Sequence, residues 1–421
     1  MSTEEMNKTE IATKIQQAGG RLYLVGGALR DTMLGKESHD EDYCVTGLTP
    51  EEFQGLFPEA RVQGKSFAVF VLENVEFAMA RTETKVGKGH KEFVIQTNQG
   101  ITIEQDLARR DITINSMAKD VLTGEIIDPF GGQKDLQNHI IRATTEHFNE
   151  DPLRVYRVAR LAAKLGFAVE DKTIQRMKDL KEELETLPKE RVLVELEKAF
   201  LTEKPSIFFE VLKKAEVLEV HFPEIQQLIG VEQPAVYHPE GDAFQHTMLV
   251  LTKATELTKG WKEKHKVQIR FAALVHDLGK GLTPKEEYPH HYGHEERGVA
   301  LVEQLGHRLG IPNHWMKCGK IAAKEHMVAG KFAEMKANTK VSFIERIAKT
   351  TLGLDGLEII AVCDRMGSSQ KGVENIAFAE IGKKCLQEIN GEWVKEKYGI
   401  TDGIALKSRL HEERVKWMKQ Q

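Results

Sequence analysis

Cysteine is scarce in this chain: the 421 residues contain four, at positions 44, 318, 363 and 385, and no two of them form a C-x-x-C pair. Neither a disulfide framework nor a cysteine-ligated zinc site is therefore indicated. No apolar run approaches the ~20 residues that a membrane-spanning helix needs, and the polar start MSTEEMNKTE lacks the features of a signal peptide. We expect a cytoplasmic protein that has no membrane partner.

A strong excess of one charge is also missing, since the formal net charge is −5. This balance does not indicate a nucleic-acid binder, but it excludes none, because a local basic surface is enough to bind phosphates. Apolar residues make up 41% of the chain and charged residues 29%, which is typical of a globular protein with a sizeable core. The length favours two to four domains.

The character of the sequence changes near residue 151. Before it, short runs rich in β-branched and aromatic residues alternate with glycine- and charge-rich turns, which predicts strands at residues 22–25, 43–46, 67–72 and 75–80. After it, the segment PLRVYRVARLAAKLGF has helical spacing, and nearly all of the remaining sequence is predicted to be helical. We therefore expect an α+β head and an all-α body, divided into residues 1–150, 151–225, 226–365 and 366–421.

Two aspartates, Asp40 and Asp42, stand at the entrance of a predicted strand. Residues two apart on a strand point to the same face, so both carboxylates can reach one ion. Hard oxygen ligands of this kind favour magnesium. A third carboxylate on a nearby strand would complete the metal site, and Glu76 in VEFAMART is the candidate. These three residues are the predicted catalytic carboxylates.

The segment YLVGGALRD precedes the aspartates and supplies Gly26, Gly27 and Arg30. Glycines allow backbone N–H groups to approach a phosphate closely, and an arginine adds a charge-assisted hydrogen-bond donor. Donors for a triphosphate together with carboxylates for metal ions are what nucleotidyl transfer requires.

With Asp31, Leu34-Gly35 and Gly47, this pattern resembles the polymerase-β-like head of bacterial CCA-adding tRNA nucleotidyltransferases and their poly(A) polymerase relatives. Further segments match that family in order: ARTETK (80–85), RRDITINSMA (109–118), IDPFGGQKDL (127–136), EDPLRVYRVAR (150–160) and ERVLVELEKAF (190–200). The resemblance implies that the head transfers nucleotides and that residues 151–225 form a neck that recognises the base.

The segment EDPLRVYRVAR also predicts a specific chemistry. At helical spacing, Asp151, Arg154 and Arg157 form a slowly drifting ridge. Asp151 can accept a hydrogen bond from the exocyclic amine of cytosine or adenine while Arg154 donates to the ring nitrogen, and uracil and guanine present the reverse pattern. The family resemblance gives Asp151 and Arg154 this role and places Arg110, Arg157 and Arg160 near the nucleotide.

A second group of candidates lies in the body, after the segment GVEQPAVYHPEGDAF (230–244), which looks like a linker. His246, the pair His276-Asp277, and Asp364 stand in GDAFQHTMLV, FAALVHDLGKG and AVCDRMG. Imidazole and carboxylate ligands suit nickel, manganese, cobalt or zinc better than magnesium, and a metal-bound water attacks phosphate esters. The order H…HD…D resembles the HD phosphohydrolase superfamily, which implies that these four residues are metal ligands. Two further histidines, at positions 294 and 326, could serve a second ion.

An HD module (226–365) behind such a head, followed by a helical tail (366–421), resembles the multifunctional CCA-adding enzymes. The resemblance implies Mg²⁺ for nucleotidyl transfer and Ni²⁺ or another transition metal at the HD site, where 2′,3′-cyclic phosphodiesterase, 2′-nucleotidase and phosphatase activities would reside. It implies tRNA, CTP and ATP as partners, and a monomer or a homodimer.

Other functions fit the sequence less well. Poly(A) polymerases share the head but typically lack an HD module, protein uridylyltransferases are much longer, and stringent-response enzymes have the two modules in reverse order. A non-catalytic RNA-binding protein would not need Asp40, Asp42, His276 and Asp277 together. A poly(A) polymerase, or an enzyme that adds only CC or only A, remains an alternative.

Overall fold

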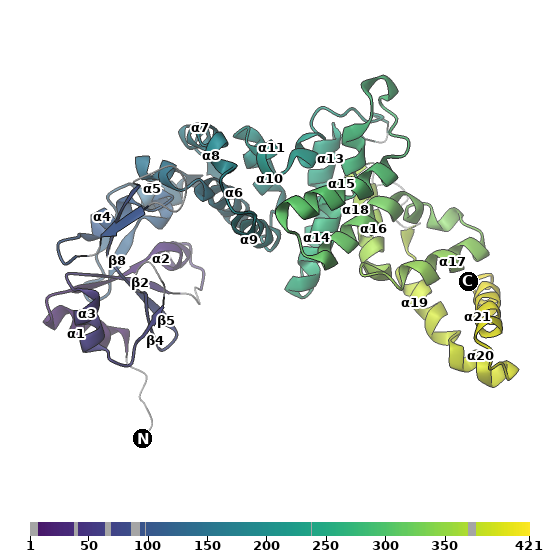
Figure 1. The fold of residues 1–421 in the computed structure, drawn as a ribbon, viewed down its shortest axis with the longest axis horizontal. Helices are drawn as coiled ribbons and strands as arrows, with labels where there is room; N and C mark the ends of the chain where they lie inside the picture. The colour runs from purple at the N-terminus through teal and green to yellow at the C-terminus, as the bar shows by residue number, and fades with distance from the viewer. Residues whose placement is uncertain are drawn as a thin grey trace. The chain divides into compact units, whose positions relative to one another are not determined.

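The computed structural model describes residues 7–37, 41–63, 69–85, 93–96, 98–236, 238–368 and 376–421. The chain divides into two units, Met1–Leu187 and Pro188–Gln421, which are shown along the chain in Figure 1. Within the described ranges, no helix is both long enough and apolar enough to cross a membrane.

The first unit is built on a mixed sheet of seven strands in the order β3-β4-β5-β2-β1-β8-β9. Its strands are β1 (Arg21–Val25), β2 (Asp42–Thr46), β3 (Arg61–Gln63), β4 (Val69–Leu72), β5 (Val75–Met79), β8 (Ala118–Asp120) and β9 (Ile126–Ile127). The four predicted strands are confirmed as β1, β2, β4 and β5, although the first residues predicted for β4 lie outside the described ranges. Two smaller pairs are β6 (Thr82–Lys85) with β7 (Phe93–Gln96) and β10 (Ile140–Ile141) with β11 (Ala168–Val169).

The helices of this unit connect and cover the strands. They are α1 (Lys8–Gln17), α2 (Gly26–Met33), α3 (Pro50–Leu56), α4 (Ile103–Ala108), η1 (Thr113–Asn115), α5 (Gly132–Gln137), η2 (Glu146–Glu150), α6 (Leu153–Leu165), α7 (Asp171–Asp179) and α8 (Lys181–Leu184). The expected α+β head followed by a helical body is confirmed, with the short strand β11 as one exception to the helical character after residue 151.

Alternation along β2 gives the sheet its two faces. Tyr43 and Val45 pack in an apolar cluster with residues of α1 and α3, whereas Cys44 packs in a second cluster with residues of α4. Because side chains two apart on a strand share a face, Asp42 lies on the same face as Cys44, the face that α4 covers. Figure 1 shows α1 and α3 together at one side of the sheet and α4 at the other.

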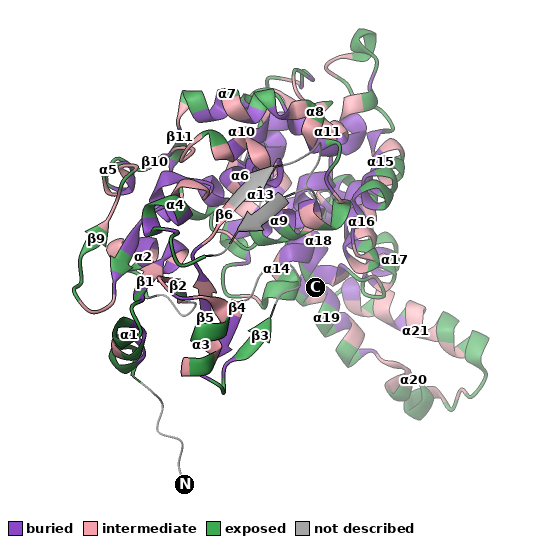
Figure 2. Cartoon of the chain, turned by 60° about the vertical axis from the view of Figure 1, so that its left-hand side comes forward, coloured by how far each residue is buried: buried purple, intermediate pink, exposed green. Residues whose placement is uncertain are grey.

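The second unit is helical throughout its described residues. Its elements are α9 (Lys189–Phe200), α10 (Ser206–Lys214), α11 (Leu218–His221), α12 (Pro223–Gln226), α13 (Ala243–Leu257), α14 (Glu263–Val275), η3 (Leu278–Leu282), η4 (Lys285–Glu287), α15 (His294–Leu309), α16 (Asn313–Ala329), η5 (Phe332–Glu334), α17 (Ala337–Ile347), α18 (Gly353–Ser368), α19 (Ala379–Glu388), α20 (Gly391–Tyr398) and α21 (Gly403–Met418). Figure 2 shows buried positions concentrated along α13, α14, α16 and α18, and far fewer along α20 and α21.

The apolar core of this unit joins α13, α14, α16 and α18. Small residues let these helices approach closely: a Cβ added to Gly319 of α16 would lie 2.8 Å from Val275 and 2.9 Å from Phe271 of α14. This contact fixes the end of α14, after which His276 and Asp277 follow directly. The four-part division into 1–150, 151–225, 226–365 and 366–421 stays a prediction.

Candidate functional sites

The parallel pairing of β2 with β5 brings two of the predicted catalytic carboxylates together. Asp42, the first residue of β2, is the register partner of Glu76 on β5, and both are exposed. Directly paired residues on adjacent strands have Cβ atoms about 5 Å apart, which is close enough for two carboxylates to share a cation. Asp40 lies outside the described residues.

At Gly26, the guanidinium of Arg110 and the carboxylate of Asp42 both lie close to the backbone. Gly26 begins α2 with φ +70°, a backbone conformation that glycine adopts without strain. A Cβ at this position would lie 3.2 Å from Arg110 Nη1 and 3.9 Å from Asp42 Oδ2. A larger residue would therefore contact both side chains, and the space beside Gly26 is lined by one positive and one negative group.

Arg110 is held by the buried carboxylate of Asp106, whose Oδ2 lies 3.0 Å from Arg110 Nη2. Burial opposes the charges of both groups. The Asp106 carboxylate nevertheless raises the pKa of Arg110, and Arg109 and Arg110 lower the pKa of Asp106. The predicted nucleotide-binding cation is thus fixed next to the Asp42 edge of the sheet, and Asp106, which the sequence reasoning missed, fixes it.

Arg30, the predicted phosphate donor, is buried in the structure. It is only 3% exposed, it pairs with Asp31 Oδ1 at 2.7 Å, and it donates to Asn115 Oδ1 at 2.6 Å. Helical geometry turns this residue back beneath the Gly-Gly turn, where Gly27 lies against its guanidinium. A direct role of Gly27 and Arg30 in phosphate binding stays a prediction. The hydrogen bond to Asn115 holds the Arg30 side chain in place.

A chain of polar contacts continues from Asn115 to the neck helix. Asn115 Nδ2 donates to Asp111 Oδ1 at 3.3 Å, and Arg157 Nε donates to Asp111 Oδ2 at 2.8 Å. Burial alone would raise the pKa of Asp111, but Arg157 outweighs it and lowers that pKa to about 2. The segment RRDITIN, recognised in the sequence only as a match, therefore joins Arg30 to α6.

The structure corrects the prediction that Asp151, Arg154 and Arg157 share one helical ridge. Helix α6 begins at Leu153, and Asp151 has extended backbone angles, φ −119° and ψ 107°. Pro152 explains this, because a proline disfavours the α region for the residue before it. Asp151 Oδ1 instead accepts a hydrogen bond from the N–H of Leu153 at 3.0 Å, which caps the helix start.

The other two arginines of this segment lie on α6 itself. Arg154 is 8% exposed, and its guanidinium donates to the backbone oxygens of Arg109, at 2.6 Å, and His147. Arg160 is half-buried two turns further along. To hydrogen-bond a nucleotide base, Arg154 would therefore have to give up at least one of these two bonds to the backbone of the head.

In the second unit, four histidines present the same ring nitrogen to a common centre. His276, His294 and His326 donate from Nδ1 to backbone carbonyl oxygens three or four residues earlier, at 2.7, 2.7 and 2.9 Å. His246 has its Nδ1 2.8 Å from the Glu240 carboxylate. Each Nε2 is thereby left as the unprotonated, metal-binding nitrogen.

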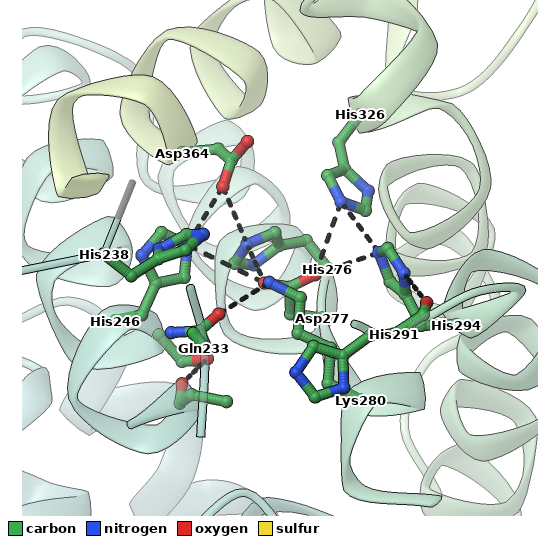
Figure 3. A network of polar contacts seen from close by, with 12 residues as sticks. Gln233, His238, His246, His276, Asp277, Lys280, His291, His294, His326 and Asp364 are labelled. Carbon is green, nitrogen blue, oxygen red and sulfur yellow. Dashed lines mark hydrogen bonds and ion pairs between the residues drawn. The ribbon is translucent and has the colours of Figure 1, made fainter. Parts of the chain in front are cut away.

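Asp277 lies between two pairs of these nitrogens. Its Oδ2 is 3.3 Å from His276 Nε2 and 3.7 Å from His246 Nε2, and its Oδ1 is 3.3 Å from His294 Nε2 and 3.4 Å from His326 Nε2. Figure 3 shows His294 and His326 on the opposite side of the carboxylate from His246. The arrangement offers one carboxylate oxygen to each of two neighbouring cation positions.

Asp364 of α18 completes the first position. Its Oδ1 lies 2.9 Å from His246 Nε2 and 3.7 Å from His276 Nε2, so the four predicted ligands, whose donor atoms lie within 4.8 Å of one another, are brought together. Asp277, His294 and His326 form a second such group. Helix α14 ends at Val275, and the His-Asp pair lies just beyond it.

The chemistry of the donor set fits a transition metal. His276 Nε2 and Asp277 Oδ1 are buried without a hydrogen bond from any described residue, which is costly unless a cation compensates them. Lys280 Nζ is 2.6 Å from Asp277 Oδ2. Burial alone would raise the pKa of Asp277, but the Lys280 ammonium holds it well below its usual range.

Sequence reasoning missed the residues that surround this centre. Lys280 is 7% exposed and donates to Gln233 Oε1 at 2.8 Å, and Glu240 accepts from His238 as well as from His246. The segment HDLGK was a visible signal for Lys280. No pattern pointed to Gln233, His238 or Glu240, because they come from residues interpreted as a linker.

Three family descriptions match consecutive parts of the chain. Residues 22–142 match "Poly A polymerase head domain", residues 166–229 match "Probable RNA and SrmB- binding site of polymerase A", and residues 243–352 match "HD domain". The order of a polymerase head followed by a body that contains an HD domain is thereby confirmed.

Solved structures share the fold across nearly the whole chain. A Thermotoga maritima CCA-adding enzyme complexed with tRNA superposes with a TM-score of 0.67 at 19% identity, covering 99% of this chain and 93% of that one. A CCA-adding enzyme with ATP gives 0.66 at 19% identity, covering 98% and 91%. A CCA-adding enzyme with CTP gives 0.65 at 20% identity, covering 97% and 90%.

Closer relatives exist in sequence. A protein of Haemophilus influenzae named "Multifunctional CCA protein" is 40% identical over 95% of this chain and 98% of its own length. A protein of the same name from Shewanella denitrificans is 40% identical over 94% of this chain and 96% of its own length. This identity extends across both units and both candidate sites, and the chain belongs to the multifunctional CCA protein family.

Proposed function

We propose that the protein is a template-independent tRNA nucleotidyltransferase that builds and repairs the 3′-terminal CCA of tRNA from CTP and ATP, and that its HD module hydrolyses phosphate esters. The register of Asp42 opposite Glu76, beside Gly26 and Arg110, carries the first part of this proposal. It is supported by relatives of the same length that bear the name multifunctional CCA protein.

In the head, Asp40, Asp42 and Glu76 would hold Mg²⁺. When bound, magnesium supplies positive charge that activates the attacking 3′-hydroxyl of tRNA and stabilises the leaving pyrophosphate. Arg110, fixed by Asp106 beside Asp42, neutralises phosphate charge, and the absence of a side chain at Gly26 leaves room for the triphosphate. The protein therefore contributes position and charge to the transfer.

Base selection is proposed for Asp151 and Arg154, supported by Arg157 and Arg160. Asp151 would accept from the amine of C or A and Arg154 would donate to the ring nitrogen, which leaves both residues unpaired with U or G. Because Arg154 donates to Arg109 O and His147 O, nucleotide entry would exchange one of these bonds. Asp111 keeps Arg157 in place.

In the HD module, His246, His276, Asp277 and Asp364 would hold Ni²⁺ or another transition metal, and His294 and His326 would join Asp277 at a second position. The bound metal supplies a hydroxide-like nucleophile and neutralises phosphate charge. Lys280, buried next to Asp277, adds a cation that attracts the ester. The proposed substrates are 2′,3′-cyclic phosphates, 2′-nucleotides and simple phosphate monoesters.

The alternative of an enzyme adding only CC or only A is tested by a gel assay. Transcripts of tRNA lacking CCA, CA or A are incubated with Mg²⁺ and each of the four nucleoside triphosphates. We expect C, C and A to be added in order and addition to stop there. A long adenosine run would move the protein to the poly(A) polymerases, and addition of one base type only would make it a partial enzyme.

Variants connect each activity to its site. Asp42→Asn should abolish nucleotide addition and leave hydrolysis of a 2′,3′-cyclic nucleotide intact, and Asp277→Asn should do the opposite. Glu51→Gln is the matched control, because Glu51 is an exposed acid on α3, which covers the other face of the sheet. Nucleotide addition at the wild-type rate by Asp42→Asn would refute the proposed head site. Sedimentation of the same samples decides between a monomer and a homodimer.

A further inference from the structure

The segment before α13 is part of the HD centre, although the HD match begins only at residue 243. Its two ends are held together, since the N–H of Gly230 donates to Asp242 Oδ2 at 2.7 Å and the N–H of Ala243 donates to Val231 O at 3.0 Å. Gln233, between these ends, accepts from Lys280. The described residues of this segment, 230–236 and 238–242, therefore form an anchored loop against the metal-binding residues.

Glu240 is the residue of this loop that contacts a proposed metal ligand. Its side chain is 7% exposed, and its Oε1 lies 2.8 Å from His246 Nδ1 and 2.8 Å from His238 Nδ1. An ionised carboxylate can only accept hydrogen bonds, so both nitrogens carry the proton. His246 is thereby fixed in the tautomer whose Nε2 is free to bind a metal ion.

Among the four histidines of the centre, His246 alone has its Nδ1 within hydrogen-bond distance of a carboxylate of the described residues, since the Glu295 carboxylate is 3.7 Å from Nδ1 of His294. The Nδ1 atoms of His276, His294 and His326 donate to backbone carbonyl oxygens. A charged partner draws the ring proton more strongly than a carbonyl does, which makes Nε2 a stronger electron donor. It also orients the ring, because Nε2 of His246 then points to Asp364 Oδ1 at 2.9 Å.

We propose that Glu240 is a positioning residue of the HD centre, which sets the affinity of the site for a divalent transition metal through the orientation and basicity of His246. This inference rests on the proposed metal site. It concerns a residue outside the matched HD region, in a loop whose sequence alone suggested a linker.

A different role for the same residues is that His238, Glu240 and His246 bind an ion of their own, since their donor atoms lie within 4.8 Å of one another. The hydrogen bonds argue against it, because both histidines direct a protonated Nδ1 at Glu240. The two roles differ in stoichiometry: a ligand of a separate ion removes one equivalent of metal when it is lost, whereas a positioning residue weakens binding at unchanged stoichiometry.

The experiment is calorimetric titration of Ni²⁺ into the full-length, chelator-stripped protein and its variants. For Glu240→Gln, which keeps an acceptor oxygen but loses the charge, we expect roughly 10-fold weaker binding, and for Glu240→Ala roughly 100-fold, the range typical of such partners. Glu210→Gln, an exposed acid on α10, is the control and should bind as the wild type does. Nucleotide addition by the head reports that each variant is folded and active.

The Nδ1 hydrogen bond of His246 provides a second readout that a purely structural role would not change. In ¹⁵N-histidine spectra of the metal-free protein, Glu240→Ala should shift the Nδ1 signal of His246, because that nitrogen loses its carboxylate partner, with His246→Asn assigning the signal. If Glu240→Ala does not fold, Glu240→Gln, which matches the wild-type side chain in size, carries the test.

Each outcome has a distinct meaning. Wild-type affinity in Glu240→Gln and Glu240→Ala would overturn the inference while leaving the metal site intact. Loss of one equivalent, with the remainder bound at wild-type affinity, would also overturn it and make Glu240 a ligand. A wild-type protein that binds no Ni²⁺, Mn²⁺, Co²⁺ or Zn²⁺ would refute the proposed HD function itself.

Discussion

Histidine occurs in this chain in contrasting surroundings, and the surroundings decide what the residue does. At the HD centre, His246 and His276 are fully buried but face carboxylates. His221 on α11 is also buried, at 8% exposure, but its charged neighbour is Arg308. Burial, and then the charge of Arg308, lowers the pKa of His221 to about 4. This histidine is therefore kept neutral by the fold.

The depressed pKa of His221 predicts a specific acid sensitivity. An unfolded histidine binds a proton below pH ~6.5, whereas the folded state resists it until about pH 4. Stability contributed by neutral His221 is thus complete above pH 6.5 and is lost as the pH falls toward 4. The loss is at most on the order of 3 kcal/mol. His221→Gln, which does not titrate, should remove this part of the pH dependence.

Urea unfolding of the metal-free protein at several pH values between 4 and 7.5 measures the effect. The variant and the wild type should differ in free energy of unfolding by an amount that changes with pH, and the wild type should lose more on acidification. His265→Gln, at an exposed position on α14, should follow the wild type. A pH-independent difference between His221→Gln and the wild type would show that His221 titrates normally in the folded protein.

At the scale of single residues, the sequence predicted which residues are metal ligands better than it predicted the burial and hydrogen-bond partners of individual side chains. His246, His276, Asp277 and Asp364 could be named because metal ligands come from few residue types and a short motif marks two of them. The burial of Arg30 could not be predicted, because it depends on Asn115, which is 85 residues distant. Glu240 was missed for a similar reason: its role depends on a hydrogen bond across an irregular loop that has no periodicity to recognise.

At the scale of elements, the candidate sites depend on the register of paired strands and on the close packing of helices. Runs rich in β-branched and aromatic residues predicted β2 and β5, but their parallel pairing of Asp42 with Glu76 is set by the packing of both faces of the sheet. In the HD module the corresponding constraint is the contact between η3 and α15. A Cβ at Gly279 of η3 would lie 1.8 Å from the carbonyl oxygen of His294 and 2.7 Å from the N–H nitrogen of Gly298.

Gly279→Ala should therefore disrupt the HD centre. The atoms in its way are backbone atoms, so η3 and α15 must separate, and His294 moves away from Asp277 Oδ1, now 3.3 Å from its Nε2. Overpacking of this kind destabilises by about 1–3 kcal/mol. We expect a lower melting temperature of the metal-free protein and weaker Ni²⁺ binding, with nucleotide addition unchanged.

The control for this substitution is Gly260→Ala, because a Cβ at Gly260 meets no atom within 4 Å. It should leave melting temperature and metal affinity at wild-type values, and thermal melts with calorimetric titration compare the two variants directly. If Gly279→Ala bound Ni²⁺ and melted like Gly260→Ala, the contact between η3 and α15 would not be a constraint on the metal centre.

At the scale of the whole molecule, each unit contains one of the two candidate sites. The carboxylate pair lies in Met1–Leu187 and the HD centre in Pro188–Gln421. The sequence marked a change of character near residue 151, whereas the compact units divide at residue 187, because α6, α7 and α8 belong to the first unit. Periodicity identifies a helix but not the core against which it packs, so such a boundary cannot be predicted from local patterns.

This division predicts that metal stabilises only one part of the protein. A ligand that binds the folded state at 100 times its dissociation constant stabilises it by about 2.7 kcal/mol. In scanning calorimetry of the chelator-stripped protein we expect two transitions, of which saturating Ni²⁺ raises only the one that reports Pro188–Gln421. The affected transition is identified by Asp277→Asn, which should abolish the shift, and by Asp42→Asn, which should retain it.

A single calorimetric transition, instead of two, would also be informative. A single transition that Ni²⁺ raises as a whole would mean that the two units unfold cooperatively, and loss of the HD metal would then destabilise the nucleotidyltransferase head. In that case Asp277→Asn should lower the temperature at which nucleotide addition is lost. With independent units, that inactivation temperature stays at the wild-type value, because the head depends on its own core of sheet and covering helices.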